Sequence, residues 1–287
     1  LAIALRDAEG QAPRVEVQAV SAEGETSAWT AASWLWREDE FIVGGVDVPE
    51  DTVALVHRVH GDDVEQIVTL EWSLTRSEVE VEPDAIDVGV GETSQPLLSR
   101  LRNAGVRSRG AWGAAGTRCT TGNSSKYRMA IHHTVTPQKR NGSYDQMVRW
   151  TQSFHMNGRG WCDVGYHFLV GQDGRVYQGR YENRTGAHAS NANYANVGVS
   201  YIGNYQVAIP PSNMLDAGAR IIRALSQTYG IALNRSRVFG HRQVGTTSTA
   251  CPGDHLYAHL GDILNRAATG VPGSATPPAP PPPPAVS

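Results

Sequence analysis

The sequence predicts an α/β or α+β fold around a single β-sheet with helices on its faces, preceded by a smaller β-sandwich-like domain. Three observations support this. Predicted strands and helices are mixed over residues 96–270, the first 77 residues contain only short strands separated by turns, and the two parts differ strongly in charge. A chain of 287 residues is also long enough for two domains.

The first part of the chain, residues 1–77, is an acidic β-rich domain. Strands are predicted at 3–6, 14–19, 41–43, 53–59 and 66–74, with glycine-containing turn signals between them. Residues 78–95 are rich in acidic side chains, which predicts a linker. Residues 271–287 hold eight of the 16 prolines and are expected to form an extended spacer, with a possible cell-wall anchor beyond it.

In the second domain, residues 96–270, predicted strands are mixed with predicted helices. Strands are predicted at 128–133, 165–170, 175–178 and 196–202, the second and third joined by a Gln-Asp-Gly turn. Apolar residues at helical spacing predict helices over 144–154, 214–229 and 256–264. Such a mixture favours one sheet covered by helices on its faces.

Composition excludes several classes of protein. No run of about 18 apolar residues occurs, so no membrane span is expected. Residues 1–95 have a net charge of −16 and residues 96–287 a net charge of +13. The basic part should attract anionic polymers. Nucleic acid is not the expected partner, because the chain has no basic helix stripe, zinc-finger spacing or aromatic RNA-binding signature.

Three cysteines, Cys119, Cys162 and Cys251, allow one disulfide and leave one thiol. Because the chain starts at Leu1, we expect a processed or trimmed product, and the lack of a signal peptide does not argue against export. In an exported protein an unpaired thiol needs an explanation, and metal ligation is one. Two histidines elsewhere in the chain, His132 and His241, could supply the other metal ligands.

His132 ends an apolar strand, and His241 lies ten residues before Cys251 in FGHRQVGTTSTACPGD. Imidazole nitrogen and thiolate sulfur are typical zinc ligands, and three protein ligands leave a fourth position for water, which is typical of a catalytic site. The alternatives are that no metal binds and that all three cysteines with His132 form a closed structural site.

Four segments in order, IHHTVT, WCDVGYHFLVGQDGRVYQGR, TGAHASNANYANVGVSYIGNY and GHRQVGTTSTACPGD, resemble the peptidoglycan recognition protein family, which is similar to phage-type zinc amidases. The resemblance extends from about 107 to about 264. It implies an α/β fold with a mixed central β-sheet flanked by helices. It also implies a Zn²⁺-dependent hydrolysis of the amide between N-acetylmuramic acid and L-alanine in bacterial peptidoglycan.

The resemblance assigns residues to roles. It implies that His132, His241 and Cys251 bind zinc, and with Cys251 on the metal, Cys119 and Cys162 are expected to form a disulfide. His133 follows a ligand on a strand, so its side chain is expected on the opposite sheet face and outside the metal site.

Further roles concern catalysis and substrate binding. Tyr166 is implied to hydrogen-bond the oxyanion or the attacking water, and Thr249 to stabilise the same intermediate. Because the gap before the cysteine is longer here than in many relatives, Thr247 and Ser248 compete with Thr249 for that role. His188 is implied to line the substrate groove.

The expected protein is therefore a secreted or wall-associated N-acetylmuramoyl-L-alanine amidase whose partner is peptidoglycan. A non-catalytic peptidoglycan-binding receptor is the alternative, since some members of the family bind without cutting. A third hypothesis makes the acidic first domain an adaptor or an autoinhibitor that docks on the basic domain.

Overall fold

The computed structural model describes residues 2–7, 14–38, 41–46, 48–49, 51–60, 67–73, 95–136 and 144–270. The predicted linker, apart from its last residue, and the proline-rich tail lie outside these residues. The proposed domain boundaries therefore stay predictions.

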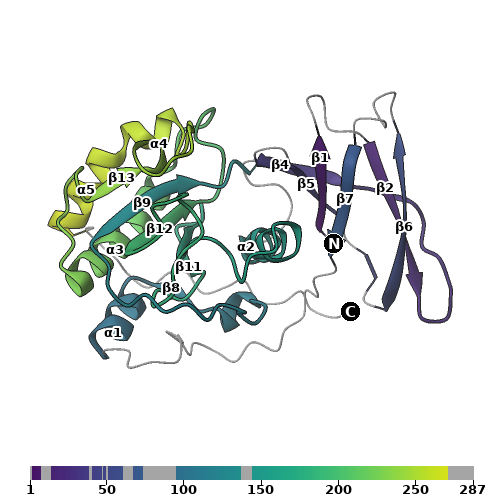
Figure 1. Cartoon of the computed structure of the whole chain (residues 1–287), viewed down its shortest axis with the longest axis horizontal. Coiled ribbons are helices and arrows are strands. Elements are labelled where there is room, and N and C mark those ends of the chain that lie inside the picture. The colour runs from purple at the N-terminus through teal and green to yellow at the C-terminus, as the bar shows by residue number, and fades with distance from the viewer. Residues whose placement is uncertain are drawn as a thin grey trace.

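The first 73 residues contain strands alone among the described elements (Figure 1). These are β1 (Ala2–Asp7), β2 (Arg14–Ser21), β3 (Thr30–Ala31), β4 (Ser33–Glu38), β5 (Phe41–Gly45), β6 (Thr52–His60) and β7 (Ile67–Ser73). They form two antiparallel sheets, ordered β4-β5-β1-β7 and β3-β2-β6. The two sheets agree with the β-sandwich-like pattern expected from the sequence.

The rest of the described chain mixes helices and strands. Its strands are β8 (Val106–Arg107), β9 (Arg128–His133), β10 (Phe168–Val170), β11 (Val176–Gln178), β12 (Asn196–Tyr201) and β13 (Val238–Gly240). Its α-helices are α1 (Gln95–Asn103), α2 (Tyr144–Ser153), α3 (Ser212–Tyr229), α4 (Asp254–Ala258) and α5 (Leu260–Thr269). Three short turns of helix are η2 (Gly110–Trp112), the π-helical η3 (Phe154–Gly158) and η4 (His241–Gln243).

The six strands β8 to β13 form one mixed sheet in the order β13-β9-β12-β10-β11-β8. Only β10 and β11 pair antiparallel, and the other neighbours are parallel. Every residue of β12 is buried, as expected for a central strand covered on both faces. The mixed sheet implied by the family resemblance is thus confirmed.

Helices cover both faces of this sheet (Figure 1). Apolar residues of α1, α3 and α5 pack with those of β9 to β13 in the larger core cluster. On the other face, Tyr144 and Val148 of α2 pack with Trp112, Leu169 and Tyr177. A Cβ on Gly218 of α3 would overlap the Tyr201 side chain, so this glycine allows the helix to approach the sheet closely.

Several local predictions differ from the structure. Helix α1 and the strands β3, β4, β8 and β13 were not expected. The helix predicted over 256–264 is two helices, since α4 ends before His259 and α5 begins after it. The strand predicted from 165 begins at Phe168. Within the described residues, no helix has the length and apolar character needed to span a bilayer.

Candidate metal centre and pocket

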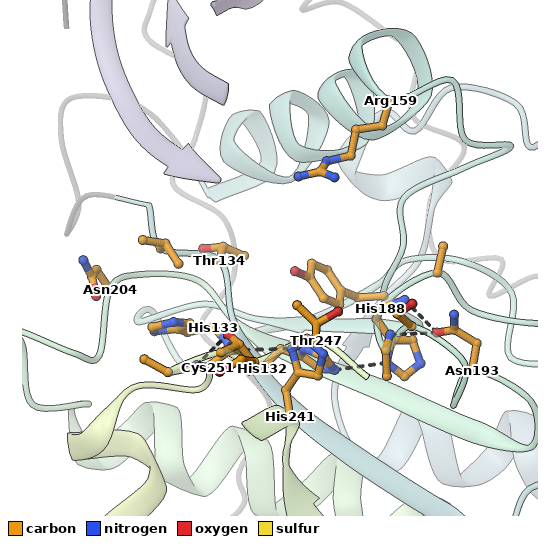
Figure 2. Close-up of a pocket in the computed structure, with 18 of the residues that line it drawn as sticks. His132, His133, Thr134, Arg159, His188, Asn193, Asn204, His241, Thr247 and Cys251 are labelled. Atoms are coloured by element: carbon orange, nitrogen blue, oxygen red, sulfur yellow. Dashed lines mark hydrogen bonds between the residues drawn. The ribbon is translucent and has the colours of Figure 1, made fainter. Parts of the chain in front are cut away.

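A pocket opens at one end of the mixed sheet, at the carboxyl ends of β9 and β13 (Figure 2). Its floor contains His132 of β9 and His241, the first residue after β13. Because β9 and β13 pair in parallel, their carboxyl ends lie at the same edge of the sheet. The loop before α4 then returns Cys251 to this edge.

His132, His241 and Cys251 are brought together as predicted. One ligand atom from each lies within 4.8 Å of the other two. The Nδ1 atom of His132 is 3.6 Å from the Cys251 Sγ atom, and the two histidine rings have centroids 4.4 Å apart. Two imidazoles and one thiol fit the donor set that zinc prefers, and they leave one coordination position for water or substrate.

The surroundings favour the ligand forms of these groups. Burial, followed by the neighbouring histidines His188, His241, His133 and His167, holds the pKa of His132 well below its usual value, so the ring is neutral. A neutral imidazole has the lone pair that a metal needs. The backbone N–H of His133 donates to Cys251 Sγ at 3.4 Å, which favours a thiolate.

His133 itself lines the pocket, but its ring is engaged elsewhere. Its Nδ1 accepts the backbone N–H of Tyr205 at 3.1 Å, and it is not among the grouped ligand atoms. Burial, then the positive charge of Arg242, lowers the pKa of His133 to about 4. Its exclusion from the metal group agrees with the sequence analysis.

Tyr166 contributes to the wall of the pocket beside His132. The two rings have centroids 5.2 Å apart and are tilted by 49°. Thr249 is half-buried, and its hydroxyl accepts the backbone N–H of Cys251 at 3.1 Å, so one lone pair is used to hold the ligand loop. Thr247 lies above the metal centre beside His241 (Figure 2). Both threonines line the pocket.

His188 is almost fully buried, with 7% of its surface exposed, although it lines the pocket. Its Nδ1 atom is 3.0 Å from Nε2 of His132. Burial lowers the pKa of His188 to about 3 against the opposing hydrogen bond to the Asn196 carbonyl. The family resemblance implied a place in the substrate groove for this residue, and its contact with a ligand histidine was not predicted.

Arg159 and Trp161 form a further part of the pocket that the sequence analysis did not identify. Arg159 follows η3 and faces the metal centre from across the pocket (Figure 2). Its guanidinium carbon is 5.2 Å from the Trp161 ring centroid. A cation here is suited to an anionic ligand, but one arginine in a loop gives no signal in a single sequence.

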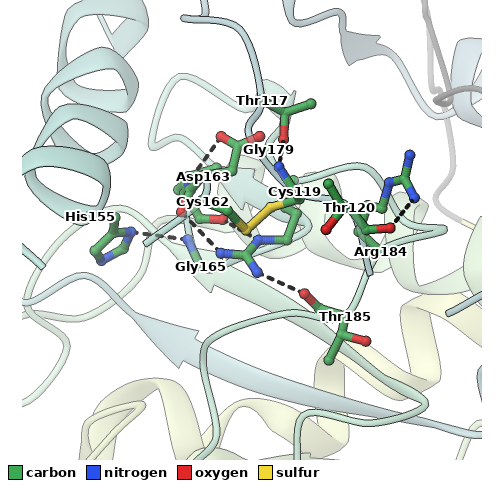
Figure 3. The surroundings of a disulfide bond; sticks show 12 residues. Thr117, Cys119, Thr120, His155, Cys162, Asp163, Gly165, Gly179, Arg184 and Thr185 are labelled. Atoms are coloured by element: carbon green, nitrogen blue, oxygen red, sulfur yellow. Dashed lines mark hydrogen bonds between the residues drawn. A yellow bond between two sulfur atoms is a disulfide. The ribbon is translucent and has the colours of Figure 1, made fainter. Parts of the chain in front are cut away.

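The disulfide between Cys119 and Cys162 is confirmed (Figure 3). Next to it, the backbone N–H of Arg118 donates to the Cys162 carbonyl at 2.9 Å. The buried Asp163 forms a salt bridge with Arg109 at 3.0 Å. The alternative structural zinc site with all three cysteines is wrong, because two of the sulfurs are bonded to each other.

Comparisons with known proteins identify relatives of this chain. A sequence model of the N-acetylmuramoyl-L-alanine amidase family matches residues 124–254. Peptidoglycan-recognition protein SC1a of Drosophila melanogaster is 36% identical over 169 residues, covering 54% of this chain and 83% of the relative. Peptidoglycan recognition protein 1 of Bos indicus is 37% identical over 159 residues, covering 53% and 80%.

A solved structure supports the same relationship. Peptidoglycan recognition protein LE in complex with tracheal cytotoxin, a monomeric diaminopimelic acid-type peptidoglycan, is 28% identical with a TM-score of 0.50. The match covers 55% of this chain and 94% of that one. The chain belongs to the peptidoglycan recognition protein family.

Proposed function

We propose that the protein is a zinc-dependent N-acetylmuramoyl-L-alanine amidase of bacterial peptidoglycan. The observation that carries the proposal is the cluster of His132, His241 and Cys251 at the floor of the pocket. The match to the amidase family model over 124–254, which includes all three residues, supports it. A protein that only binds peptidoglycan would not need a thiol and two imidazoles grouped at the sheet edge.

His132, His241 and Cys251 would hold the zinc ion. Zinc bound there supplies a Lewis acid that polarises the scissile carbonyl and lowers the pKa of water. The Tyr166 hydroxyl would donate a hydrogen bond to the oxyanion, and its position beside His132 suits this role. Thr249, or its neighbours Thr247 or Ser248, which also line the pocket, would add a second donor, and the Thr249 oxygen also accepts the backbone N–H of Cys251.

The electrostatics of the second domain suit a substrate that carries carboxylates. Six aspartates are each paired with an arginine; they are Asp145, Asp163, Asp173, Asp216, Asp254 and Asp262. The positive excess of residues 96–287 therefore comes from further basic residues. Binding to isolated cell walls should weaken as salt rises from 0.05 to about 0.5 M. Unchanged wall binding over this range would contradict the electrostatic part of the proposal.

The expected place of action is outside the cell, at the bacterial wall. The Cys119–Cys162 disulfide fits an oxidising compartment. The predicted proline-rich spacer over 271–287 would suit a link to the wall, and this stays a prediction because the tail lies outside the described residues.

The test compares wild type with Cys251→Ser on two measurements. Zinc content after dialysis should be about one ion per chain for wild type and much lower for the variant. Wild type should release stem peptides from purified murein, as detected by mass spectrometry, and Cys251→Ser should not. The receptor alternative predicts wall binding by both proteins and peptide release by neither, and that result would overturn the amidase proposal.

A further inference from the structure

Three buried histidines lie in a row on the pocket side of the mixed sheet. His188 stands between His132 of β9 and His167, which immediately precedes β10. Its ring centroid is 5.0 Å from that of His132 and 5.6 Å from that of His167, with both pairs edge to face. None of the three is more than 7% exposed.

Hydrogen bonds define which nitrogens carry protons in this row. Nε2 of His188 lies 3.3 Å from the carbonyl oxygen of Asn196, and a carbonyl can only accept, so Nε2 carries the proton. In a neutral ring Nδ1 is then an acceptor. Nε2 of His132, 3.0 Å away, must therefore be the donor. This leaves the Nδ1 lone pair of His132 directed to the side where Cys251 Sγ lies at 3.6 Å.

The backbone is shaped to hold the His188 ring in this place. A Cβ on Gly198, in the middle of β12, would lie 2.6 Å from Cγ of His188. A Cβ on Gly186 would also overlap the ring, at Cδ2 and Nε2. Glycine inside a strand weakens it and marks a close approach, which here is the imidazole. The side-chain oxygen of Asn193 accepts the backbone N–H of His188 at 2.8 Å and so fixes its main chain.

We propose that His188 is a positioning residue for the metal centre. Its Nδ1 accepts a hydrogen bond from the Nε2–H of His132, which fixes the tautomer and the ring orientation of that ligand, and its own ring is held by the Asn196 carbonyl. Partners of this kind commonly change metal affinity 10- to 100-fold. The inference rests on the proposed zinc function, and it gives His188 a role behind the ligand in place of the groove role implied by the family resemblance.

The experiment measures zinc affinity by chelator competition and the absorption spectrum of the Co²⁺-substituted protein. His188→Ala should bind zinc about 10- to 100-fold more weakly than wild type and should alter the Co²⁺ bands. His188→Gln keeps an amide that can accept and donate, so its loss should be smaller. Neither readout depends on amidase activity.

His167→Ala is the matched control. His167 is equally buried and bonded at both nitrogens, but its partners are the Gly198 N–H and the Arg184 carbonyl rather than a ligand. Its replacement should lower stability and leave zinc affinity within about threefold of wild type. If His167→Ala weakens zinc binding as much as His188→Ala does, the effect comes from general disruption and the proposal is wrong.

The remaining outcomes separate this proposal from the proposed function. A wild-type protein that binds no zinc would refute the metal centre itself. A wild type that binds zinc together with a His188→Ala variant of equal affinity would refute only the positioning role, and a raised KM would then favour the groove role. Should His188→Ala not fold, Gly198→Ala serves instead, because its Cβ displaces the ring while the imidazole remains. Unchanged zinc affinity in folded Gly198→Ala would likewise overturn the proposal.

Discussion

Replacing Cys119 and Cys162 together by serine removes a cross-link between residues 43 positions apart in the sequence. In the chain-entropy treatment, a closed loop of this length stabilises the folded state by about 4 kcal/mol at 25 °C. With a urea dependence of about 2 to 3 kcal/mol per molar, the unfolding midpoint should fall by about 1.3 to 2 M. The effect should extend to the pocket, since Tyr166 follows Cys162 by four residues.

Pulse proteolysis in urea measures this midpoint on the full chain, with zinc removed so that metal binding does not contribute. Cys251→Ser is the control, because it deletes a thiol without breaking a cross-link, and it should leave the apoprotein midpoint within about 0.5 M of wild type. A double variant whose midpoint falls by less than about 0.5 M would refute the reasoning, since the denatured chain would then gain little freedom when the loop opens.

Three further predictions concern catalysis and pH. Tyr166→Phe should lower kcat about 100-fold with little change in zinc content, and an unchanged kcat would remove the tyrosine from the mechanism. Burial lowers the pKa of Lys126 to about 8, so between about pH 8 and 10.5 the unfolded chain binds a proton that the folded chain does not. The free energy of unfolding of wild type, relative to that of Lys126→Met, should therefore rise by up to about 1.4 kcal/mol per pH unit in that window. Urea titrations in which the two proteins show the same pH dependence would contradict this. Burial, then the charge of Lys126, also lowers the pKa of His167. The unfolded chain therefore binds the extra proton first, and the free energy of unfolding should fall as pH drops below about 6.5. Unfolding followed by tryptophan fluorescence should show a shallower fall in His167→Gln than in wild type.

Much of the sheet could be predicted because its strands carry local signals. The apolar run of β9 and the buried run of β12 are recognisable without knowledge of their partners. The same is not true of β8, whose two residues are too few to show a period. Helix α1, which begins at the last residue of the predicted linker, was also missed.

The break between α4 and α5 shows where periodicity is insufficient. Leu256, Leu260 and Ile263 have spacings compatible with one continuous helix, and all three are buried. The interruption at His259 leaves the ring Nδ1 near the His255 carbonyl at 2.7 Å. Two helices that share an apolar face give the same sequence pattern as one, so the pattern cannot distinguish them.

The three metal ligands could be predicted because imidazole and thiol groups are recognisable from residue type. The contact between His132 and His188 could not, because it depends on which residues lie close together in the fold. His132 and His188 are 56 positions apart, and no spacing rule joins them. One signal was present in the sequence: Gly198 lies between two valines in the middle of a predicted strand, and a glycine there indicates that another group approaches the backbone.

The sheet register ties these parts together. His132 of β9 pairs with Ser200 of β12 two residues beyond Gly198, so the ligand and the glycine that accommodates its partner share one face of the sheet. A slip of one residue between β9 and β12 would reverse this face and separate His132 from His188. Because β13 pairs with β9 on its other side, the same register also sets His241 beside His132. The chemistry of the pocket therefore depends on the pairing of three parallel strands as directly as on the ligand residues themselves.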